Sequence, residues 1–253
     1  MAGTDPLVLL HGLGMSARVW DPVRPWLEPH HQVMAPTALG HRGGPVAARR
    51  PVRVSDLVDA AEWQLDERGL DRPHLAGNSL GGWMAIELAR RGRARSVCAL
   101  SPAGSWTAGT AEQTDGVAKI RRARLKARLG RPTPVLLRSG LFRRMALSEI
   151  AVHGDRLGAD PTREAGRDLL ECAAADDILA TDEQLAPLDP LPCPVTLAWA
   201  SHDALLPLEV NGAVARARFP RARFVVLPDV GHVPMIDDPR RVAETILETV
   251  RDA

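Results

Sequence analysis

Residues Gly77-Asn78-Ser79-Leu80-Gly81 decide how this chain is organised. The short apolar run at 73–76 precedes them and is typical of a buried strand, and the stretch at 82–89 that follows is rich in helix formers. The pattern predicts a strand, a sharp turn and a helix, with Ser79 at the apex. Glycines on both sides of the serine remove side chains where strand and helix pass closely, so the hydroxyl can project from the end of the strand.

The segments around this turn alternate between strand and helix patterns. Continuous apolar runs predict strands, and apolar residues at helical spacing predict helices, with Ser55 as the N-cap of one helix and Asp238 as the cap of the last. This alternation favours an α/β fold with a doubly wound, mainly parallel sheet of about six strands. The predicted strands are 7–10, 32–35, 73–76, 96–100, 195–200 and 222–227, and the main predicted helices are 56–68, 82–89 and the segment that begins at 239.

The strand pattern is absent between 106 and 189, where only helical stretches are found. Helices are predicted over 117–129, over 134–145 running into 147–152, and from an N-cap and N1 pair at Asp160-Pro161. An all-helical insert between two strands of such a sheet is most simply a cap over the carboxyl edge. We therefore expect a core made of 1–105 and 190–253 and a helical cap made of 106–189. Four apolar residues of the cap are candidates to line a substrate pocket: Trp106, Leu141, Phe142 and Met145.

The first predicted cap helix is strongly basic, and this feature has two interpretations. Basic residues at nearly every turn could capture an acidic substrate or partner, or they could form a solvated face that keeps a small lid in solution. The second interpretation is favoured because the arginines do not converge on one point. The residues are Lys119, Arg121, Arg122, Arg124, Lys126, Arg128 and Arg131.

Composition excludes several classes of function. With 32 Lys and Arg against 31 Asp and Glu the net charge is +1, so no global field would recruit nucleic acid or an anionic membrane. No run approaches the roughly 20 apolar residues of a membrane span, and the N-terminus lacks the pattern of a secretory signal, which predicts a cytoplasmic protein. Cys98, Cys172 and Cys193 are far apart and form no metal-binding pattern. We expect no metal, no cofactor and a small-molecule substrate, while the oligomeric state stays open.

Ser79, Asp203 and His232 each follow the end of a predicted strand. The carboxyl ends of parallel strands meet at one edge of a sheet, where ligands bind, so these three side chains are expected to lie together. A serine needs a base to take its proton, and histidine is suited to this because its ordinary pKa is near neutrality. An aspartate bonded to the other ring nitrogen would orient that histidine. The spacing therefore predicts a catalytic triad.

The loop His11-Gly12-Leu13-Gly14 ends the first predicted strand with turn residues. Amides left free by such a turn can face an anion, so the N–H of Leu13 is a candidate donor to an oxyanion and Gly12 is a candidate pocket residue. His11 is expected to order the loop and not to take part in catalysis.

Together these residues resemble the α/β-hydrolase fold superfamily, specifically its small cap-bearing serine hydrolases. Residues 11–14 look like its oxyanion loop, 77–81 like its nucleophile elbow, 201–203 like its acid loop and 231–232 like its histidine loop. The order Ser, Asp, His is also that of the family. The resemblance implies that the backbone amides of Leu13 and Leu80 form the oxyanion hole. Only six residues precede Leu7, so the antiparallel edge strands that usually begin this fold are expected to be missing or truncated.

The resemblance implies hydrolysis of a carboxylic ester or related acyl compound through an acyl-serine intermediate, as in carboxylesterases. Relatives that open epoxides or displace halide use a carboxylate at the elbow, and Ser79 is not one. The alternatives that stay open are carbon–carbon bond hydrolysis of an acidic β-diketone, hydroxynitrile lyase, perhydrolase or acyltransferase chemistry, and ligand binding without turnover.

Overall fold

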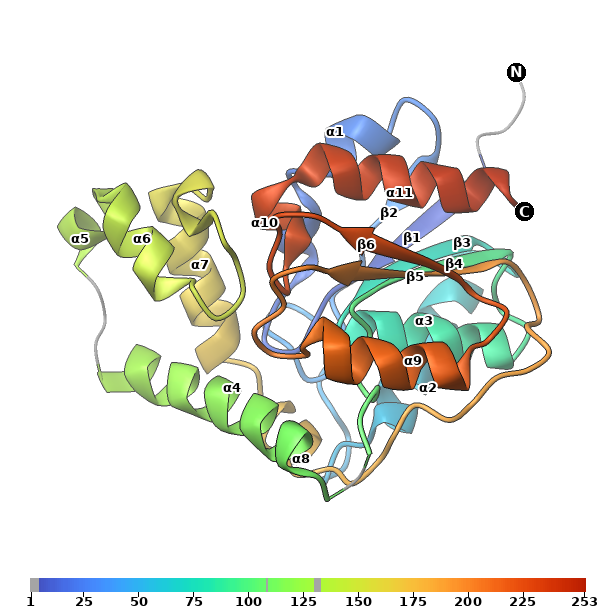
Figure 1. Ribbon diagram of the computed structural model, residues 1–253, viewed down its shortest axis with the longest axis horizontal. Helices are drawn as coiled ribbons and strands as arrows, with labels where there is room; N and C mark the ends of the chain where they lie inside the picture. The colour runs from blue at the N-terminus through green and yellow to red at the C-terminus, as the bar shows by residue number, and fades with distance from the viewer. Residues whose placement is uncertain (1–4, 108, 130–132) are drawn as a thin grey trace.

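A six-stranded sheet forms the centre of the computed structural model, which describes residues 5–107, 109–129 and 133–253 (Figure 1). The strand order is β2-β1-β3-β4-β5-β6, and every neighbouring pair is parallel. The predicted α/β fold with about six parallel strands is confirmed, and the described residues add no antiparallel edge strand. The strands are β1 (Pro6–Leu10), β2 (Gln32–Met34), β3 (His74–Asn78), β4 (Ser96–Leu100), β5 (Val195–Ala200) and β6 (Arg223–Leu227).

Helices cover both faces of this sheet, as a doubly wound fold requires (Figure 1). One face carries α2 (Val54–Asp66), α3 (Leu80–Arg90) and α9 (Ala213–Arg218), and the other carries α1 (Arg24–Leu27) and α11 (Pro239–Arg251). Alternate side chains of the strands therefore point into two separate apolar cores. Leu57 of α2 belongs to the first core and Ile246 of α11 to the second, and neither side chain reaches solvent.

The register of the strands brings their carboxyl ends to a common edge. Gly77 of β3 pairs with Leu10 of β1 on one side and with Ala99 of β4 on the other. Loops that leave the strands at this edge therefore start close together, although they are far apart in the sequence.

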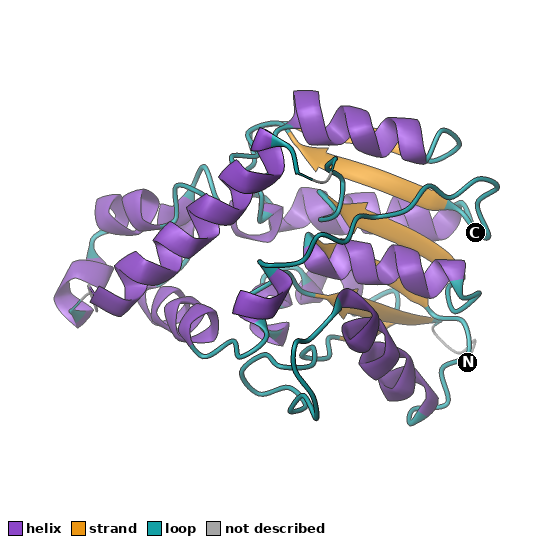
Figure 2. Ribbon diagram, turned by 90° about the horizontal axis from the view of Figure 1, so that it is seen from below, coloured by secondary structure: helices purple, strands orange, loops and turns teal. Residues whose placement is uncertain are grey.

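Between β4 and β5 the described residues form an insertion whose regular elements are all helices, and these helices lie to one side of the sheet (Figures 1 and 2). Its helices are α4 (Ala111–Leu129), α5 (Pro134–Arg138), α6 (Gly140–Ala146), α7 (Ala159–Leu170) and α8 (Ala175–Ile178), with a 3₁₀ turn at Gly154–Arg156. Outside the insertion, the short elements are a 3₁₀ turn at Ala17–Trp20, a π-helical turn at Leu208–Gly212 and α10 (Pro234–Asp237).

Three predicted helix boundaries are wrong, each for a local reason. The helix expected over 134–145 is broken at Ser139, whose backbone is extended and whose hydroxyl accepts the Phe142 N–H at 3.3 Å, so Ser139 caps a new helix. Helix α7 begins at Ala159 and not at Pro161. A proline is tolerated in the first turn, because the N–H that it lacks would have no partner within the helix. Helix α2 begins at Val54, ahead of the predicted cap Ser55, because Asp56 accepts the Arg53 N–H at 2.9 Å.

The insertion is joined to the core by a carboxylate. Asp168 of α7 is buried, and its oxygens accept from the Ser16 hydroxyl, the Arg18 guanidinium and the Arg42 guanidinium, each at 2.6 Å. Arg42 also reaches Glu164, one turn earlier on α7. These contacts fix α7 against two loops that leave the carboxyl ends of β1 and β2.

Candidate active site

Ser79 occupies a strained turn between β3 and α3. Its φ of 54° and ψ of −117° lie in a region that residues other than glycine rarely adopt. Its N–H donates to the Leu100 carbonyl at 2.9 Å, and its carbonyl accepts from the N–H groups of Ala103 and Trp83 at 3.0 and 3.1 Å. Hydrogen bonds to the neighbouring strand, the following loop and the helix therefore hold the strained residue in place.

The glycines on both sides of Ser79 are required by close backbone contacts. A Cβ on Gly77 would lie 2.1 Å from the Gly81 carbonyl oxygen, and a Cβ on Gly81 would lie 2.1 Å from the Leu10 carbonyl oxygen. Real Cβ atoms do not approach oxygen so closely. The backbone of α3 can therefore pass over β1 and β3 only because both residues lack side chains.

His232 and Asp203 form a buried hydrogen-bonded pair at the ends of β6 and β5. The distance from His232 Nδ1 to Asp203 Oδ2 is 2.8 Å. Asp203 Oδ1 accepts the N–H groups of Leu205 and Leu206 at 3.0 and 2.7 Å, so both carboxylate oxygens have donors. A proton on Nδ1 leaves Nε2 as the free acceptor of the ring, which is the form a general base requires.

Asn78 connects the serine to the histidine loop. Its side-chain amide donates to the His232 carbonyl at 2.8 Å and to the Leu100 carbonyl at 3.3 Å. Because Asn78 directly precedes Ser79, this amide fixes the two catalytic candidates relative to each other. The sequence analysis does not predict this role. The one indication in the sequence is an amide residue directly after a predicted buried strand.

One cavity brings Ser79 and His232 together with Leu13 and Leu80. It encloses about 640 Å³ of empty space, including space open to solvent. Ser79, His232 and Thr181 supply its hydroxyl and imidazole groups, and the rest of its lining is almost entirely apolar. The other lining residues are Trp83, Ala103, Trp106, Gly116, Val117, Ile120, Ile178, Leu179, Leu205 and Leu206.

Two backbone amides beside the serine have the properties of oxyanion donors. Leu80 is the first residue of α3, so its N–H has no acceptor within the helix, and the positive end of the helix dipole lies at this point. Neither this N–H nor that of Leu13 donates to another residue in the described part of the chain. Gly12 packs against the same turn, because a Cβ on it would lie 3.4 Å from Ser79 Cβ.

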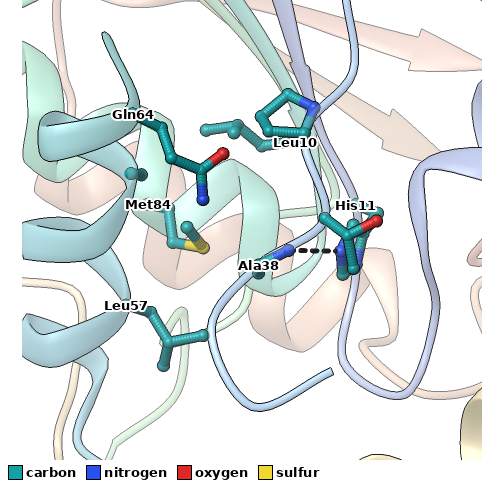
Figure 3. Close-up of a pocket in the computed structure, with 9 residues that line it drawn as sticks. Leu10, His11, Ala38, Leu57, Gln64 and Met84 are labelled. Carbon is teal, nitrogen blue, oxygen red and sulfur yellow. Dashed lines mark hydrogen bonds between the residues drawn. The ribbon is translucent and has the colours of Figure 1, made fainter. Parts of the chain in front are cut away.

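His11 orders the loop that carries Leu13. Its Nε2 accepts the Ala38 N–H at 3.0 Å (Figure 3). The ring proton is therefore on Nδ1, which donates to the Gly12 carbonyl at 2.8 Å. Burial, with the charge of nearby His41 adding to it, lowers the pKa of His11 to about 3. His11 therefore stays neutral near pH 7 and serves as a structural bridge between two loops.

Figure 3 shows a second, smaller cavity, which is also lined by His11. Leu10, Leu57 and Met84 give it mainly apolar walls, and Gln64 contributes an amide. Ser79 and His232 are not among its lining residues, so it is separate from the candidate active site.

The pocket residues expected from the insertion have different locations. Trp106 lines the main cavity and meets Trp83 edge to face, with ring centroids 5.8 Å apart. Leu141, Phe142 and Met145 do not line it; Leu141 and Met145 are 81% and 66% exposed on α6. The insertion contributes α4 and α8 to the cavity in place of α6. The signal for α4 was present in the sequence, since Val117 and Ile120 are apolar residues at helical spacing on a helix that is otherwise basic.

The described residues were compared with the patterns of metal sites, disulfides and membrane spans. No cluster of three or more His, Cys, Asp or Glu side chains suited to a metal ion occurs within 5–107, 109–129 and 133–253. The three cysteines are unpaired, and burial raises the pKa of the Cys98 thiol to about 12. None of the helices in these same ranges is long and apolar enough to cross a bilayer.

Comparison with known proteins identifies hydrolases among the relatives of this chain. A family model described as the alpha/beta hydrolase family matches residues 7–245. The protein named Epoxide hydrolase EphH from Mycobacterium tuberculosis is 35% identical over 78% of this chain and 94% of its own length. A pimeloyl-[acyl-carrier protein] methyl ester esterase from Aromatoleum aromaticum is 30% identical over 97% of this chain and 98% of its own length.

Solved structures show the same fold. A thermophilic esterase from Thermogutta terrifontis matches with a TM-score of 0.73 and 24% identity, covering 98% of this chain and 90% of that one. An enol-lactonase from Burkholderia xenovorans matches with a TM-score of 0.75 and 21% identity, covering 99% of this chain and 92% of that one. At these identities the likeness concerns the fold alone.

Proposed function

Because the chain belongs to the alpha/beta hydrolase family, we propose that it is a serine hydrolase that cleaves a carboxylic ester or a related acyl compound. The observation that carries this proposal is the location of Ser79 and His232 on one cavity, with Asp203 bonded to the far nitrogen of the histidine. Nucleophile, base and orienting carboxylate are thereby supplied from the ends of three strands. An esterase among the relatives supports the same chemistry.

The proposed reaction uses these groups in two half-reactions. Ser79 Oγ attacks the acyl carbon while His232 Nε2 takes the hydroxyl proton, and the imidazolium then gives that proton to the departing alcohol oxygen. The product of this half is an ester between the acyl group and Ser79. Water attacks that ester, its proton passes to His232, and the proton returns to Ser79 as the carboxylic acid leaves. No external oxidant or cofactor is needed to balance either half.

The amides of Leu13 and Leu80 are proposed to hold the negative oxygen of each tetrahedral intermediate. A single donor of this kind contributes about 3 kcal/mol, roughly a hundredfold in rate, when it is fixed before the reaction begins. Both amides are fixed here: Leu80 by the start of α3, and Leu13 by the loop that His11 orders.

The cavity indicates the kind of acyl or alcohol group that would fit. Its walls are mainly leucine, isoleucine, valine and tryptophan, which favour an apolar group over a charged one. Three of these residues, Val117, Ile120 and Ile178, come from α4 and α8, and we propose that the insertion 106–189 acts as a cap that shapes the pocket. Among the described lining residues none is an arginine, which favours an ester over an acidic β-diketone.

Replacement of the nucleophile tests this function directly. Ser79→Ala is expected to reduce hydrolysis of p-nitrophenyl esters by about 10⁴-fold or more. The melting temperature is expected to change little, because the hydroxyl is not needed for the backbone contacts of the turn. Ser148→Ala, an exposed serine of the insertion, is the matched control and should keep wild-type activity. A Ser79→Ala enzyme with near-normal turnover would refute the assignment, and an inactive wild type would favour a binding role.

Epoxide hydrolysis needs separate consideration, because one relative is named an epoxide hydrolase. A carboxylate that opens an epoxide forms an ester, which water can cleave at its carbonyl carbon. Ser79 would instead form an ether, which has no such carbon and would end the cycle after one turnover. We therefore expect styrene oxide to be consumed no faster than in buffer, and multiple turnovers that Ser79→Ala retains would show a route independent of the serine.

A further inference from the structure

The outer part of the insertion is strongly basic, although the net charge of the whole chain is close to zero. Residues 116–148 contain ten Lys and Arg and no Asp or Glu. The whole chain has a net charge of +1, so the remainder carries −9. The molecule is therefore strongly polarised, and its positive pole lies in α4, α5 and α6.

Most of these cations form no ion pair within the described part of the chain. Lys119 pairs with Asp115, Arg124 pairs with Asp176, and Arg143 donates to backbone carbonyls. Six others are exposed, and in the described part of the chain no carboxylate lies within ion-pair distance of them. These six are Arg121, Arg122, Lys126, Arg128, Arg138 and Arg144.

Large aliphatic side chains are exposed among the same cations. Leu125 and Leu129 lie one turn apart on one side of α4, and Leu141 and Met145 are related in the same way on α6. Leu129 is 80% exposed, as strongly as Leu141. Val135 and Leu136 of α5 are exposed as well, which makes six exposed apolar residues in all. We call these six residues and the six exposed cations named above the apical surface.

The apical surface is at the end of the molecule away from the sheet. Figures 1 and 2 both place α5 and α6 beyond the core, with α4 leading from the core toward them. Helix α4 also lines the active-site cavity through Val117 and Ile120, so one helix belongs to both the cavity wall and the apical surface.

We propose that the apical surface docks the protein onto an anionic lipid surface. Several Lys and Arg on the same helices as exposed aliphatic side chains suit a bilayer interface, which offers negative headgroups and an apolar layer beneath them. An acidic protein would satisfy the cations, but protein interfaces are typically anchored by aromatic residues, and none of the six exposed apolar residues is aromatic. The proposal concerns binding and does not depend on the catalytic assignment.

Vesicle sedimentation tests the proposal. The wild type is expected to sediment with phosphatidylcholine vesicles that contain about 30 mol% phosphatidylglycerol, to release as salt is raised, and to bind pure phosphatidylcholine about tenfold or more weakly. The variant Arg121→Gln/Arg122→Gln/Arg128→Gln removes charge, and the variant Leu129→Ser/Leu141→Ser/Met145→Ser removes exposed apolar area. Each is expected to lower the partition coefficient about tenfold or more.

Matched controls carry the same kinds of change elsewhere. Arg49→Gln/Arg53→Gln/Arg251→Gln changes the net charge equally, and Val46→Ser/Trp63→Ser removes exposed apolar residues of the core. Both should bind vesicles like the wild type, and circular dichroism checks that every variant is folded. Absence of wild-type binding at low salt, or equal losses in the controls, would overturn the proposal. Soluble polyglutamate provides a further test. If the protein bound polyglutamate as tightly as vesicles, and the aliphatic substitutions did not weaken that binding, the proposal would be overturned in favour of an acidic partner.

Discussion

The strain at Ser79 is maintained by residues that have no chemical role. The serine has a positive φ because its N–H and carbonyl are held by Leu100, Ala103 and Trp83, and because the glycines beside it let α3 approach two strands. A hydroxyl that projects from such a turn needs no rearrangement to meet a substrate. Backbone packing therefore fixes the position of the hydroxyl that is proposed to act as the nucleophile.

This view predicts a severe effect of a single methyl group at Gly81. Its Cβ would lie 2.1 Å from the Leu10 carbonyl oxygen and 2.7 Å from that of His11, and neither backbone atom can move without disturbing β1. Gly81→Ala is expected to lower the free energy of unfolding by about 4 kcal/mol or more, measured by urea denaturation.

Gly166→Ala is the matched control for that experiment. Gly166 lies within α7 and a Cβ there would meet nothing within 4 Å, so its replacement is expected to stabilise the protein by up to about 1 kcal/mol. Similar losses in both variants would show that the close approach at Gly81 is not what makes glycine necessary.

The residues with proposed chemical roles are easier to recognise in the sequence than the residue proposed to position them. Ser79, Asp203 and His232 are marked by their types and by their places after apolar runs. Asn78 is not marked in this way, because its contact with the His232 carbonyl joins residues 154 positions apart and depends on the strand order. Leu141 and Met145 are apolar, but apolarity alone does not distinguish a residue of a cavity wall from one on an exposed surface.

At the scale of secondary-structure elements, helix α7 of the insertion is attached to the core by ionic and hydrogen-bonded contacts. Helix α7 has no large apolar residue among its buried positions, which are Thr162 and Asp168. Asp168 instead collects a hydroxyl and two guanidinium groups from the loops after β1 and β2. The helix boundaries in this part were also the least predictable, because single side chains such as Ser139 decide where each helix begins.

Asp168→Asn is expected to loosen this attachment. Loss of the charge weakens the contacts to Arg18 and Arg42 and leaves their guanidinium groups less well paired. We expect a loss of about 2 kcal/mol in unfolding free energy, reduced from the cost of a fully buried pair because Arg18 is half exposed. Hydrogen exchange over 159–170 should accelerate more than exchange over β3.

Glu164→Gln separates this effect from a general change of charge. Glu164 meets the same Arg42 from a more exposed position, so its replacement is expected to cost less and to leave exchange over 159–170 nearer the wild type. Equal effects of the two substitutions would contradict a special role for the buried carboxylate.

At the scale of the whole molecule, the parallel sheet could be predicted because its inner strands, such as β4 and β5, are buried on both faces and are rich in apolar residues. The same burial has a consequence for stability at low pH. Burial lowers the pKa of His11 to about 3, and it is also the main cause that lowers the pKa of His41, from an ordinary value of 6.5. The folded protein therefore keeps these rings neutral where the unfolded chain protonates them.

The sign of the resulting pH dependence follows from proton counting. Below about pH 6.5 the unfolded chain binds a proton at His11 that the folded protein does not, so acidification favours unfolding by about 1.4 kcal/mol per pH unit, and this continues toward pH 3. His11→Gln should be less stable than the wild type at pH 7, because the Ala38 and Gly12 contacts change, but should lose stability less steeply between pH 6 and pH 4.5. Urea denaturation at several pH values measures both slopes. If the wild type and His11→Gln showed the same slope, the acid sensitivity would have to come from other groups, and the neutral loop-bridging role of His11 would have to be abandoned.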